Sequence, residues 1–361
     1  MAIAARTPMI AITIINSTNV NPCFIFLLFI DFIIHLQEIF CKSYFFDLLY
    51  MNNENDLKEN GFMLKKTLAL AMILFVGLST GCVPNKFQFE KEFGKSGSNR
   101  REFLSATDMD LTSKGDLVIA DAGNTRIQVI TTNGDSVMVA GESGREGYKL
   151  QSITGIGVNP LTDDVLVCDQ RGNKIVRFDS AGEPNLRIVD KMKFPMDVCI
   201  DRKGNSYVIM SKQSEIYKYD ANGKYLATIG GSGKAAMLFP TSILLHNDHL
   251  FITDFGAKRV IKLGLDGNFV GEYKDKGEYE EIKGPSGMHI DNLGNLYILD
   301  LGEVPVVILS PDGKLISKVG DFGNQPGQFL YPTGVIAKSP EEIYVLDNSR
   351  NTILNFKMKP E

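Results

Sequence analysis

The sequence predicts an all-β fold, a six-bladed β-propeller, because an apolar strand that ends in Asp recurs along the chain at regular distances. Five copies are LVIAD (117–121), VLVCD (165–169), LFITD (250–254), LYILD (296–300) and IYVLD (343–347). A sixth copy, SYVIM (206–210), has Met210 in the Asp position. Successive Asp positions are 48, 41, 44, 46 and 47 residues apart, and this period is typical of one four-stranded blade per repeat.

Each copy is accompanied by the other strands of a four-stranded antiparallel blade. A first strand precedes it, in the segments 106–112, 153–159, 195–201, 240–246, 285–291 and 332–338. A third strand follows it, and five of the six third strands end in a Gly-containing turn such as TTNG (131–134). Asn-Gly and Asp-Gly supply the φ > 0 residues that tight hairpins require. A fourth strand is therefore expected after each turn.

The sixth repeat lacks a fourth strand, since the sequence stops at Glu361. The segment FQFEKEFGKSG (87–97) looks like a fourth strand followed by a Gly-rich linker. We expect the amino-terminal strand 87–94 to pair with the carboxy-terminal blade, because closure of the ring protects strand edges that would otherwise remain open. The predicted propeller domain spans residues 87–361.

The repeats resemble the NHL-repeat family of six-bladed propellers. The resemblance rests on D-x-x-N-x-R-I at 121–127, on Asn-Gly at 133–134, and on VGDFGNQPGQFLYPTGV (319–335). Met210, and Glu303 and Pro305 in the fifth repeat, depart from the pattern, and the second repeat retains only Asn173-Lys174 of its loop. The resemblance implies a binding platform and does not fix a chemistry.

The segment MLKKTLALAMILFVGLSTGC (63–82) has the layout of a secretory signal, with two lysines, an apolar stretch and small residues before Cys82. It resembles a bacterial lipoprotein signal. We therefore expect a signal peptide at 63–81, lipidation of Cys82, a lipidated linker at 82–86, and a lipid-anchored location on the extracytoplasmic side of a membrane of the bacterial cell envelope. Residues 1–62 fit badly before such a signal. They are either a start-site artefact, with translation beginning at Met63, or an extra membrane segment.

Composition argues against nucleic acid as a partner, because 38 basic and 43 acidic residues give a net charge of −5 and phosphate-binding domains carry a basic excess. The five cysteines have no Cys-x-x-Cys spacing. Cys168 and Cys199 lie in apolar strand-like runs. We expect buried free thiols there, with a disulfide between them as the alternative.

Two repeated columns of charged residues are candidate sites. The first contains the Asp residues that end the second strands, Asp121, Asp169, Asp254, Asp300 and Asp347. We expect a structural role, in which they accept backbone N–H bonds from nearby loops; a ring of carboxylates around Ca²⁺ is the alternative. The second column contains Arg126, Lys174 and Arg259, which either bind an anionic ligand on one face or pair with local carboxylates.

Aromatic residues in the Gly-rich linkers extend this candidate binding face. Tyr148, Tyr279 and Tyr331 are the members we select, because aromatic loop residues favour interfaces. Packing between blades is the alternative for the Phe or Tyr that precedes Pro.

The predicted function is a binding or scaffold protein that presents its loop face to a protein, peptide or glycan. No catalytic residue and no cofactor is predicted, and enzymatic activity is the less favoured reading. Only His246, His249 and His289 lie in the exported part, and their positions do not predict a convergent Zn²⁺ site. The alternative is a metal-dependent lactonase- or lyase-type enzyme with a divalent ion, Ca²⁺ or Zn²⁺, in the central channel.

Overall fold

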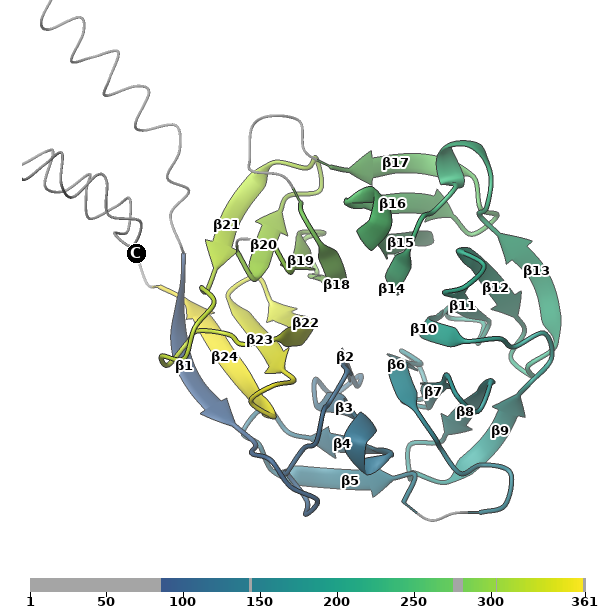
Figure 1. Cartoon of the computed structure of the whole chain (residues 1–361), viewed down its shortest axis with the longest axis horizontal. Coiled ribbons are helices and arrows are strands. Elements are labelled where there is room, and N and C mark those ends of the chain that lie inside the picture. The colour runs from purple at the N-terminus through teal and green to yellow at the C-terminus, as the bar shows by residue number, and fades with distance from the viewer. Residues whose placement is uncertain (1–85, 143–144, 275–281, 303, 360–361) are drawn as a thin grey trace, which may run out of the picture. The chain divides into compact units, whose positions relative to one another are not determined.

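The computed structural model describes residues 86–142, 145–274, 282–302 and 304–359, which form a six-bladed β-propeller (Figure 1). The chain divides into two units, Met1–Pro84 and Asn85–Glu361, and the blades belong to the second. The expected signal peptide, Cys82 and residues 1–62 lie outside the described residues. Within the described ranges, no helix has the length and apolar character needed to cross a membrane.

Each blade is an antiparallel sheet whose strands follow one another from the channel outward. The first strands line the channel: β2 (Asp108–Leu111), β6 (Ile153–Val158), β10 (Pro195–Ile200), β14 (Pro240–His246), β18 (Pro285–Ile290) and β22 (Pro332–Ser339). The second strands are β3 (Leu117–Asp121), β7 (Val165–Asp169), β11 (Ser206–Met210), β15 (His249–Asp254), β19 (Leu296–Asp300) and β23 (Glu342–Asp347).

The outer half of each blade repeats in the same way. The third strands are β4 (Arg126–Ile130), β8 (Lys174–Phe178), β12 (Glu215–Tyr219), β16 (Arg259–Gly264), β20 (Val306–Leu309) and β24 (Thr352–Met358). The fourth strands are β5 (Ser136–Ala140), β9 (Pro184–Ile188), β13 (Tyr225–Ile229), β17 (Phe269–Tyr273), β21 (Leu315–Val319) and β1 (Phe87–Phe93). We number the blades 1 (β2–β5), 2 (β6–β9), 3 (β10–β13), 4 (β14–β17), 5 (β18–β21) and 6 (β22–β24 with β1).

The amino-terminal strand closes the ring, which confirms the prediction for residues 87–94. β1 pairs antiparallel with β24, from Phe87 opposite Met358 to Phe93 opposite Ile353. Phe87 is buried in a cluster with strands of blades 5 and 6, and the Lys359 N–H donates to the Lys86 carbonyl at 2.8 Å. The strand therefore supplies the fourth position of the last sheet.

The hydrophobic core is divided into clusters that lie between neighbouring blades. The described residues form six such clusters, one for each junction of the ring. The second strands are buried on both faces, as in the all-buried LVIAD of β3. Each sheet therefore stabilises its neighbours by apolar burial, at about 25 cal/mol per Å².

The ring has two faces. We call the face with the blade-to-blade linkers and the loops between second and third strands the linker face; it carries the short 3-10 turns η1 (Ala122–Asn124), η2 (Gly233–Ala235) and η3 (Phe255–Ala257). The opposite face carries the turns between first and second strands and between third and fourth strands, and we call it the hairpin face. Figure 1 is viewed from the linker face.

Candidate functional site

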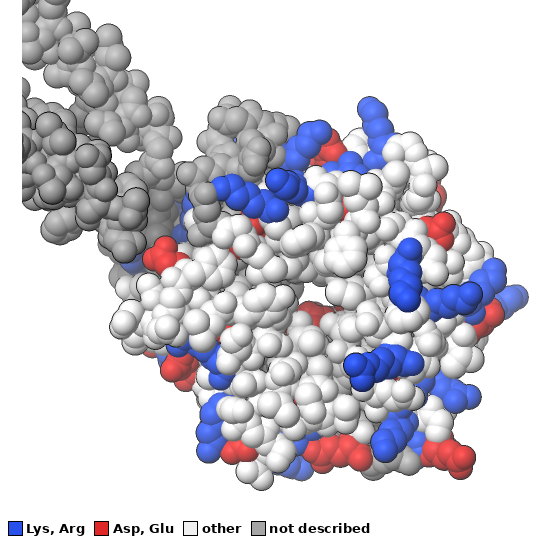
Figure 2. All heavy atoms as spheres, in the orientation of Figure 1, with Lys and Arg blue, Asp and Glu red and all other residues white. Residues whose placement is uncertain are grey.

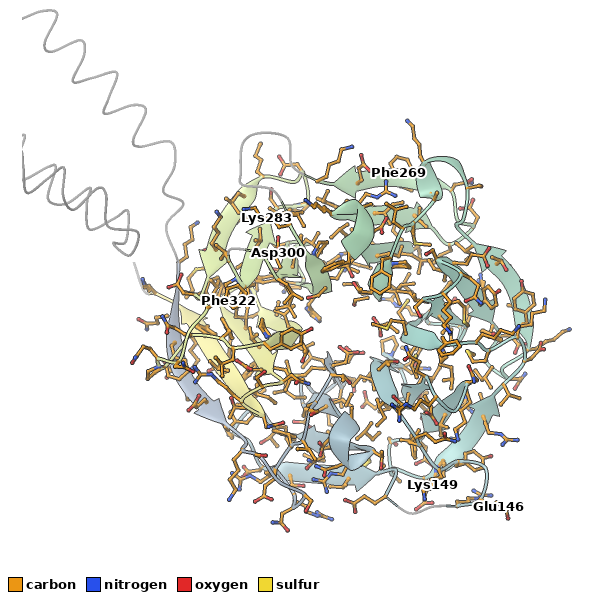
Figure 3. All side chains as sticks on the ribbon, in the orientation of Figure 1. Glu146, Lys149, Phe269, Lys283, Asp300 and Phe322 are labelled. Atoms are coloured by element: carbon orange, nitrogen blue, oxygen red, sulfur yellow. The ribbon has the colours of Figure 1, made fainter. Side chains whose placement is uncertain are left out.

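The repeated Asp residues lie at the linker face, where each joins its own blade to the incoming linker. Four of the five are fully buried and Asp300 is 3% exposed. Asp254 accepts the backbone N–H groups of Leu238 and Phe239, both at 3.0 Å. Asp121, Asp169, Asp300 and Asp347 accept equivalent N–H groups at 2.7–3.2 Å. In Figure 3, Lys283 and Asp300 lie side by side at one of these junctions.

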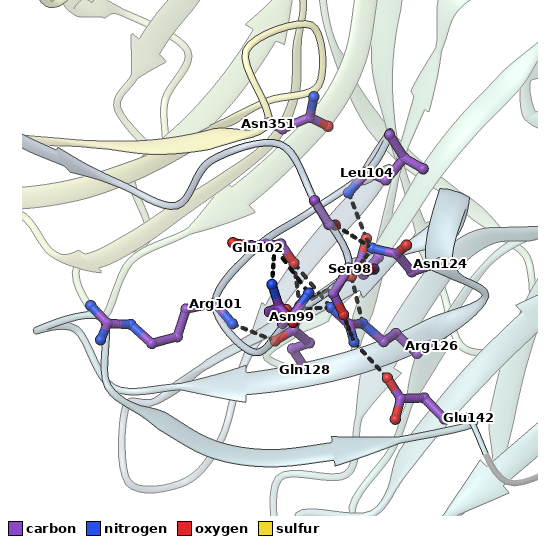
Figure 4. Close-up of polar contacts among 12 residues, drawn as sticks. Ser98, Asn99, Arg101, Glu102, Leu104, Asn124, Arg126, Gln128, Glu142 and Asn351 are labelled. Atoms are coloured by element: carbon purple, nitrogen blue, oxygen red, sulfur yellow. Dashed lines mark hydrogen bonds and ion pairs between the residues drawn. The ribbon is translucent and has the colours of Figure 1, made fainter.

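Arg126 fills the first of these junctions (Figure 4). Its side chain is only 2% exposed. The guanidinium donates to Asp121 at 2.8 Å and to Glu142. It also donates to the carbonyl oxygens of Ser98 and Asn99, both at 2.7 Å, and of Glu102 at 3.1 Å. Five donors in a fixed fork are thereby used inside the protein. This arrangement ties the closing linker to blade 1.

Lys174 and Arg259 lie in the same way at their own junctions. The Lys174 ammonium donates to the Lys149 carbonyl at 2.6 Å and is 3.4 Å from Asp169. Arg259 donates to the Ala236 carbonyl and pairs with Asp254 and Glu272. The structure thus places Arg126, Lys174 and Arg259 inside blade junctions with internal partners, not on an open basic face.

The three selected tyrosines are separated from one another. Tyr148 is partly buried beneath Arg145, whose guanidinium carbon is 5.2 Å from the ring centroid. Tyr331 is 48% exposed on the linker face. Tyr279 lies outside the described residues. Phe239 and Tyr331 both precede Pro, but neither is enclosed between blades, because Phe239 is 47% and Tyr331 48% exposed. The buried wedges are Phe103 and Phe329, each fully enclosed.

Exposed apolar side chains gather at the linker-face mouth of the channel. We call them the apolar rim: Leu104, Leu238, Phe239, Phe255, Leu330 and Tyr331. Five of them lie just before a first strand and Phe255 follows a second strand, so all border the channel opening. The surface around the opening in Figure 2 is largely free of charged residues, except where Lys and Arg gather over blades 2 to 4.

The central channel contains a cavity of about 290 Å³ lined by the first strands of blades 1 to 5. Its polar wall includes Asp108 and Asp110 from β2, Asp197 from β10, and His246 and His289 from β14 and β18. Pro160 and His246 lie at turns of the hairpin face, so the cavity occupies that half of the channel. No group of three His, Cys, Asp or Glu arranged to hold a metal occurs among the described residues.

The channel carboxylates join first strands of neighbouring blades. Asp108 and Asp110 accept the backbone N–H groups of Ile156 and Val158 in β6, at 2.9 and 2.7 Å. Asp197 accepts the N–H of Ile243 in β14 at 2.8 Å. Edge N–H groups of these inner strands are thus satisfied by side chains of the preceding blade.

Burial changes the proton affinity of these groups. It raises the pKa of Asp197 to about 7 and that of Asp110 to about 6. The pKa of Asp108 is raised well above its ordinary value, first by burial and then by the charge of Asp197. No ion pair of a described cation reaches these three carboxylates to oppose the effect of burial.

The histidines do not converge. His289 accepts the Ala337 N–H through Nδ1 at 3.2 Å, and burial lowers its pKa to about 4. At the β14–β15 turn, His246 contacts the side-chain amide nitrogen of Asn247, and His249 contacts the backbone carbonyl oxygen of the same residue. Cys168 and Cys199 are free and buried, as expected, and burial raises the pKa of both thiols.

The channel carboxylates are the polar group that the sequence reasoning missed. A signal was present, because Asp108, Asp110 and Asp197 stand within otherwise apolar first strands. Gly155 and Gly157 between them were a second signal. A Cβ on Gly157 would lie 2.3 Å from the Val198 carbonyl oxygen, so only glycine allows β6 to approach β10 so closely.

Comparisons with known proteins agree with this architecture. Residues 277–360 match a family model described as a 6-bladed beta-propeller. The chain is 24% identical to Protein brain tumor of Drosophila melanogaster over 164 residues, 43% of this chain and 16% of that protein. It is also 24% identical to the E3 ubiquitin-protein ligase TRIM32 of Homo sapiens over 283 residues, 74% of this chain and 38% of that protein. The chain thus spans well under half of either relative.

Solved structures show the same fold at low sequence identity. A virginiamycin B lyase from Staphylococcus aureus aligns with a TM-score of 0.53 at 13% identity, over 76% of this chain and 100% of that chain. A protein of unknown function from Bacteroides thetaiotaomicron aligns with a TM-score of 0.58 at 15% identity, over 76% of each chain. Together the similarities support a six-bladed propeller built from NHL-type repeats.

Proposed function

We propose that this protein is a lipid-anchored, extracytoplasmic binding protein whose linker face docks a protein partner. The observation that carries the proposal is the apolar rim. Its members are 39–68% exposed and lie on one face, in a group of three at blade 4 and a group of three at the entries of blades 6 and 1. Exposed apolar residues that cluster in this way are typical of interaction sites, whereas scattered ones are ordinary. On the hairpin face, Leu161 and Leu293 stand singly, on the turns of blades 2 and 5.

The chemistry of the rim favours a protein or peptide over a glycan. Leucine, phenylalanine and tyrosine side chains gain by burial against other apolar side chains, and aromatic residues are enriched at the centres of protein interfaces. The three cations that the sequence offers as a binding face for an anionic ligand, Arg126, Lys174 and Arg259, are used internally.

The anchor would leave this face accessible. Cys82 lies five residues before Phe87 in the sequence, a reach of at most about 18 Å. β1 starts at the hairpin face, because Lys86 there accepts the N–H of Lys359 at the end of β24. An acyl chain on Cys82 would therefore hold the hairpin side near the membrane, and the linker face would point away from it.

Site-specific photo-crosslinking tests the proposal in cells that carry the full chain. Benzoylphenylalanine would replace Leu238 or Leu330 on the linker face, and Leu161 or Leu293 on the hairpin face as matched controls. We expect the same protein adduct from both linker-face positions and none from the controls. Adducts from the hairpin face alone, or no adduct from the rim, would contradict the proposal. Palmitate labelling that is lost in Cys82→Ser would test the anchor separately.

A lyase-type activity in the channel is the second candidate function. It is favoured by the cavity with three carboxylates and two histidines, and by the likeness of the fold to the Staphylococcus aureus lyase. The engagement of Asp108, Asp110, Asp197 and His289 with backbone N–H groups weighs against it. Metal analysis of the full chain purified without chelator discriminates between the two. A stoichiometric divalent ion that is lost in Asp197→Asn would favour the lyase.

A further inference from the structure

We propose that blades 2 to 4 of the linker face bind an acidic segment of the partner in which aromatic or aliphatic residues alternate with carboxylates. The inference rests on the proposed function and names the chemistry of the partner. The surface in question, the basic–aromatic patch, consists of Arg171, Lys193, Lys212, Lys258, Phe239 and Phe255. All six side chains are exposed.

Hydrogen bonds connect the loops of the patch into one continuous arc. The Phe194 N–H donates to Asn173 at 3.0 Å, and Ser211 donates to the Phe194 carbonyl at 3.1 Å, which joins the loops of blades 2 and 3. Ser214 donates to the Leu238 carbonyl at 3.1 Å, which joins blade 3 to the linker of blade 4. These contacts fix the loops before a ligand arrives, and a preorganised surface loses less entropy on binding.

The aromatic residues of the arc are also held in place. The Phe239 and Phe255 rings contact edge to face with centroids 6.2 Å apart, and the Phe255 N–H donates to the Phe239 carbonyl. Lys212 places its ammonium 3.3 Å from the Phe194 ring centroid. A carboxylate that approaches Lys212 therefore meets a cation that is already oriented by an aromatic face.

The arc carries four cations, and the exposed Asp190 and the partly buried Glu215 lie just outside its segments. The segments 170–173, 192–194, 211–214, 236–239 and 255–258 contain Arg171, Lys193, Lys212 and Lys258 and no Asp or Glu. Among the described ion pairs, none involves these four cations. Figure 2 shows Lys and Arg gathered on this side of the opening, and Figure 3 places Glu146, an acid of the linker before β6, at the outer rim of the ring.

Two arginines of the other half of the mouth are used inside the protein. Arg350 pairs with Asp347 and donates to the Gly323 carbonyl, and Arg126 is enclosed by its own partners. Arg171, Lys193, Lys212 and Lys258 are thus exposed cations on blades 2 to 4 of a chain whose net charge is −5, and the linker before β2 adds the exposed Arg100 and Arg101. Such a local field attracts an acidic segment and orients it across the apolar rim.

An acidic, apolar peptide fits this surface better than nucleic acid or a lipid bilayer does. Four cations separated by aromatic and aliphatic side chains do not form the continuous basic track that follows a phosphate backbone. A bilayer would have to reach the face opposite to the one where the anchor enters. Alternating carboxylates and apolar side chains would satisfy the cations and cover Phe239 and Phe255 together.

Binding of a defined probe tests the proposal with the detergent-solubilised full chain. The probe is a fluorescein-labelled peptide that repeats Glu-Glu-Phe-Glu-Glu-Leu, measured by fluorescence anisotropy. We expect binding that weakens several-fold as NaCl rises. We also expect at least tenfold weaker binding when Arg171, Lys193, Lys212 and Lys258 are all changed to Glu. The matched control changes Lys114, Arg202, Lys203 and Lys224 to Glu, since these exposed cations lie on turns of the hairpin face.

Further probes separate the alternatives. A peptide with Ser in place of Phe and Leu should bind at least tenfold more weakly than the parent peptide. Oligothymidylate of equal charge and phosphatidylglycerol vesicles should bind more weakly still, and tighter binding of either would overturn the proposal. Equal losses in the patch and control variants would also overturn it. If the charge-reversed patch does not fold, Lys193→Gln with Lys212→Gln replaces it, with the same expected direction.

Failure of this inference is distinguishable from failure of the proposed function. If crosslinks from Leu238 and Leu330 persist in the charge-reversed patch, the linker face still docks a protein and only the acidic chemistry is wrong. If those crosslinks never form, the docking face itself is wrong.

Discussion

The molecule contains two sets of buried aspartates that make the same kind of contact in different surroundings. At the linker face, Asp121, Asp169, Asp254 and Asp347 accept backbone N–H groups and also form ion pairs with Arg or Lys. In the channel, Asp108, Asp110 and Asp197 accept backbone N–H groups without an ion-pair partner among the described cations. Burial raises the pKa values of this channel set.

The comparison teaches that a buried carboxylate keeps its charge more easily when a cation lies beside it. Desolvation disfavours the charged form at both places, and an opposite charge within a few ångströms offsets it. Blade 3 supports this reading, because it lacks both members of the pair. Met210 takes the Asp position and is fully buried, and Glu215 takes the position of the cation.

Met210→Asp should have the largest effect, because it would place a carboxylate in a fully buried site beside Glu215 rather than a cation. We expect the free energy of unfolding to fall by about 4–6 kcal/mol through lost apolar burial and an unpaired charge. Adding Glu215→Arg should recover part of the loss. Denaturant unfolding of the single and double variants measures both effects. A double variant no more stable than the single one would show that the cation is not what blade 3 lacks.

Asp121→Ala is the next largest expected change. It removes the acceptor of the Leu104 N–H and leaves the buried Arg126 guanidinium with the exposed Glu142 as its remaining carboxylate partner. Breaking a buried pair by removal of one partner costs about 3–5 kcal/mol. Asp135→Ala, at an exposed hairpin position, should change the stability by less than about 0.5 kcal/mol. Similar losses at both positions would argue against a special role for the junction.

The sequence predicted the ring well because the same pattern of strands and turns recurs in each blade. Apolar strands and turn glycines predict the number of blades and the strand order within each blade, and one spare strand predicts closure by residues 87–94. Where one repeat departs from the pattern, the other repeats still show it. Strand limits were less certain: the first strand expected at 106–112 is Asp108–Leu111.

The candidate site was harder to predict because it depends on contacts between repeats. The sequence shows a column of cations, Arg126, Lys174 and Arg259, but it does not show that their side chains are buried. Burial depends on linkers some 25 residues away, as when Arg126 donates to the carbonyl oxygens of Ser98 and Asn99. Phe239 and Phe329 occur in similar linkers, yet one is exposed and the other enclosed. Phe239 directly precedes Pro240, whereas Phe329 lies three residues before Pro332, and this difference was the available signal.

The channel set should make stability depend on pH. Because the folded-state pKa of Asp197 is about 7, against an ordinary value of 3.8, the folded protein holds a proton that the unfolded chain has released. This contribution is present below about pH 4 and is lost as pH rises through 7. Asp197→Asn should therefore reduce the fall in unfolding free energy between pH 4 and 7 by roughly 1–3 kcal/mol. Denaturant unfolding across this range measures it, and an unchanged slope would contradict the assignment.

His289 should act in the opposite direction and more weakly. Burial lowers its pKa from 6.5 to about 4, and its neutral Nδ1 accepts the Ala337 N–H. Its contribution to stability is present above pH 6.5 and is lost as pH falls towards 4. This partly cancels the effect of the carboxylates over the same range. His289→Gln, which keeps an acceptor, should steepen the fall in unfolding free energy between pH 4 and 6.5 by roughly 1–2 kcal/mol. His249→Gln, at the β14–β15 turn on the hairpin face, is the matched control. A shallower slope in His289→Gln would mean that this histidine is protonated in the folded channel, where it would pair with the carboxylates instead of opposing them.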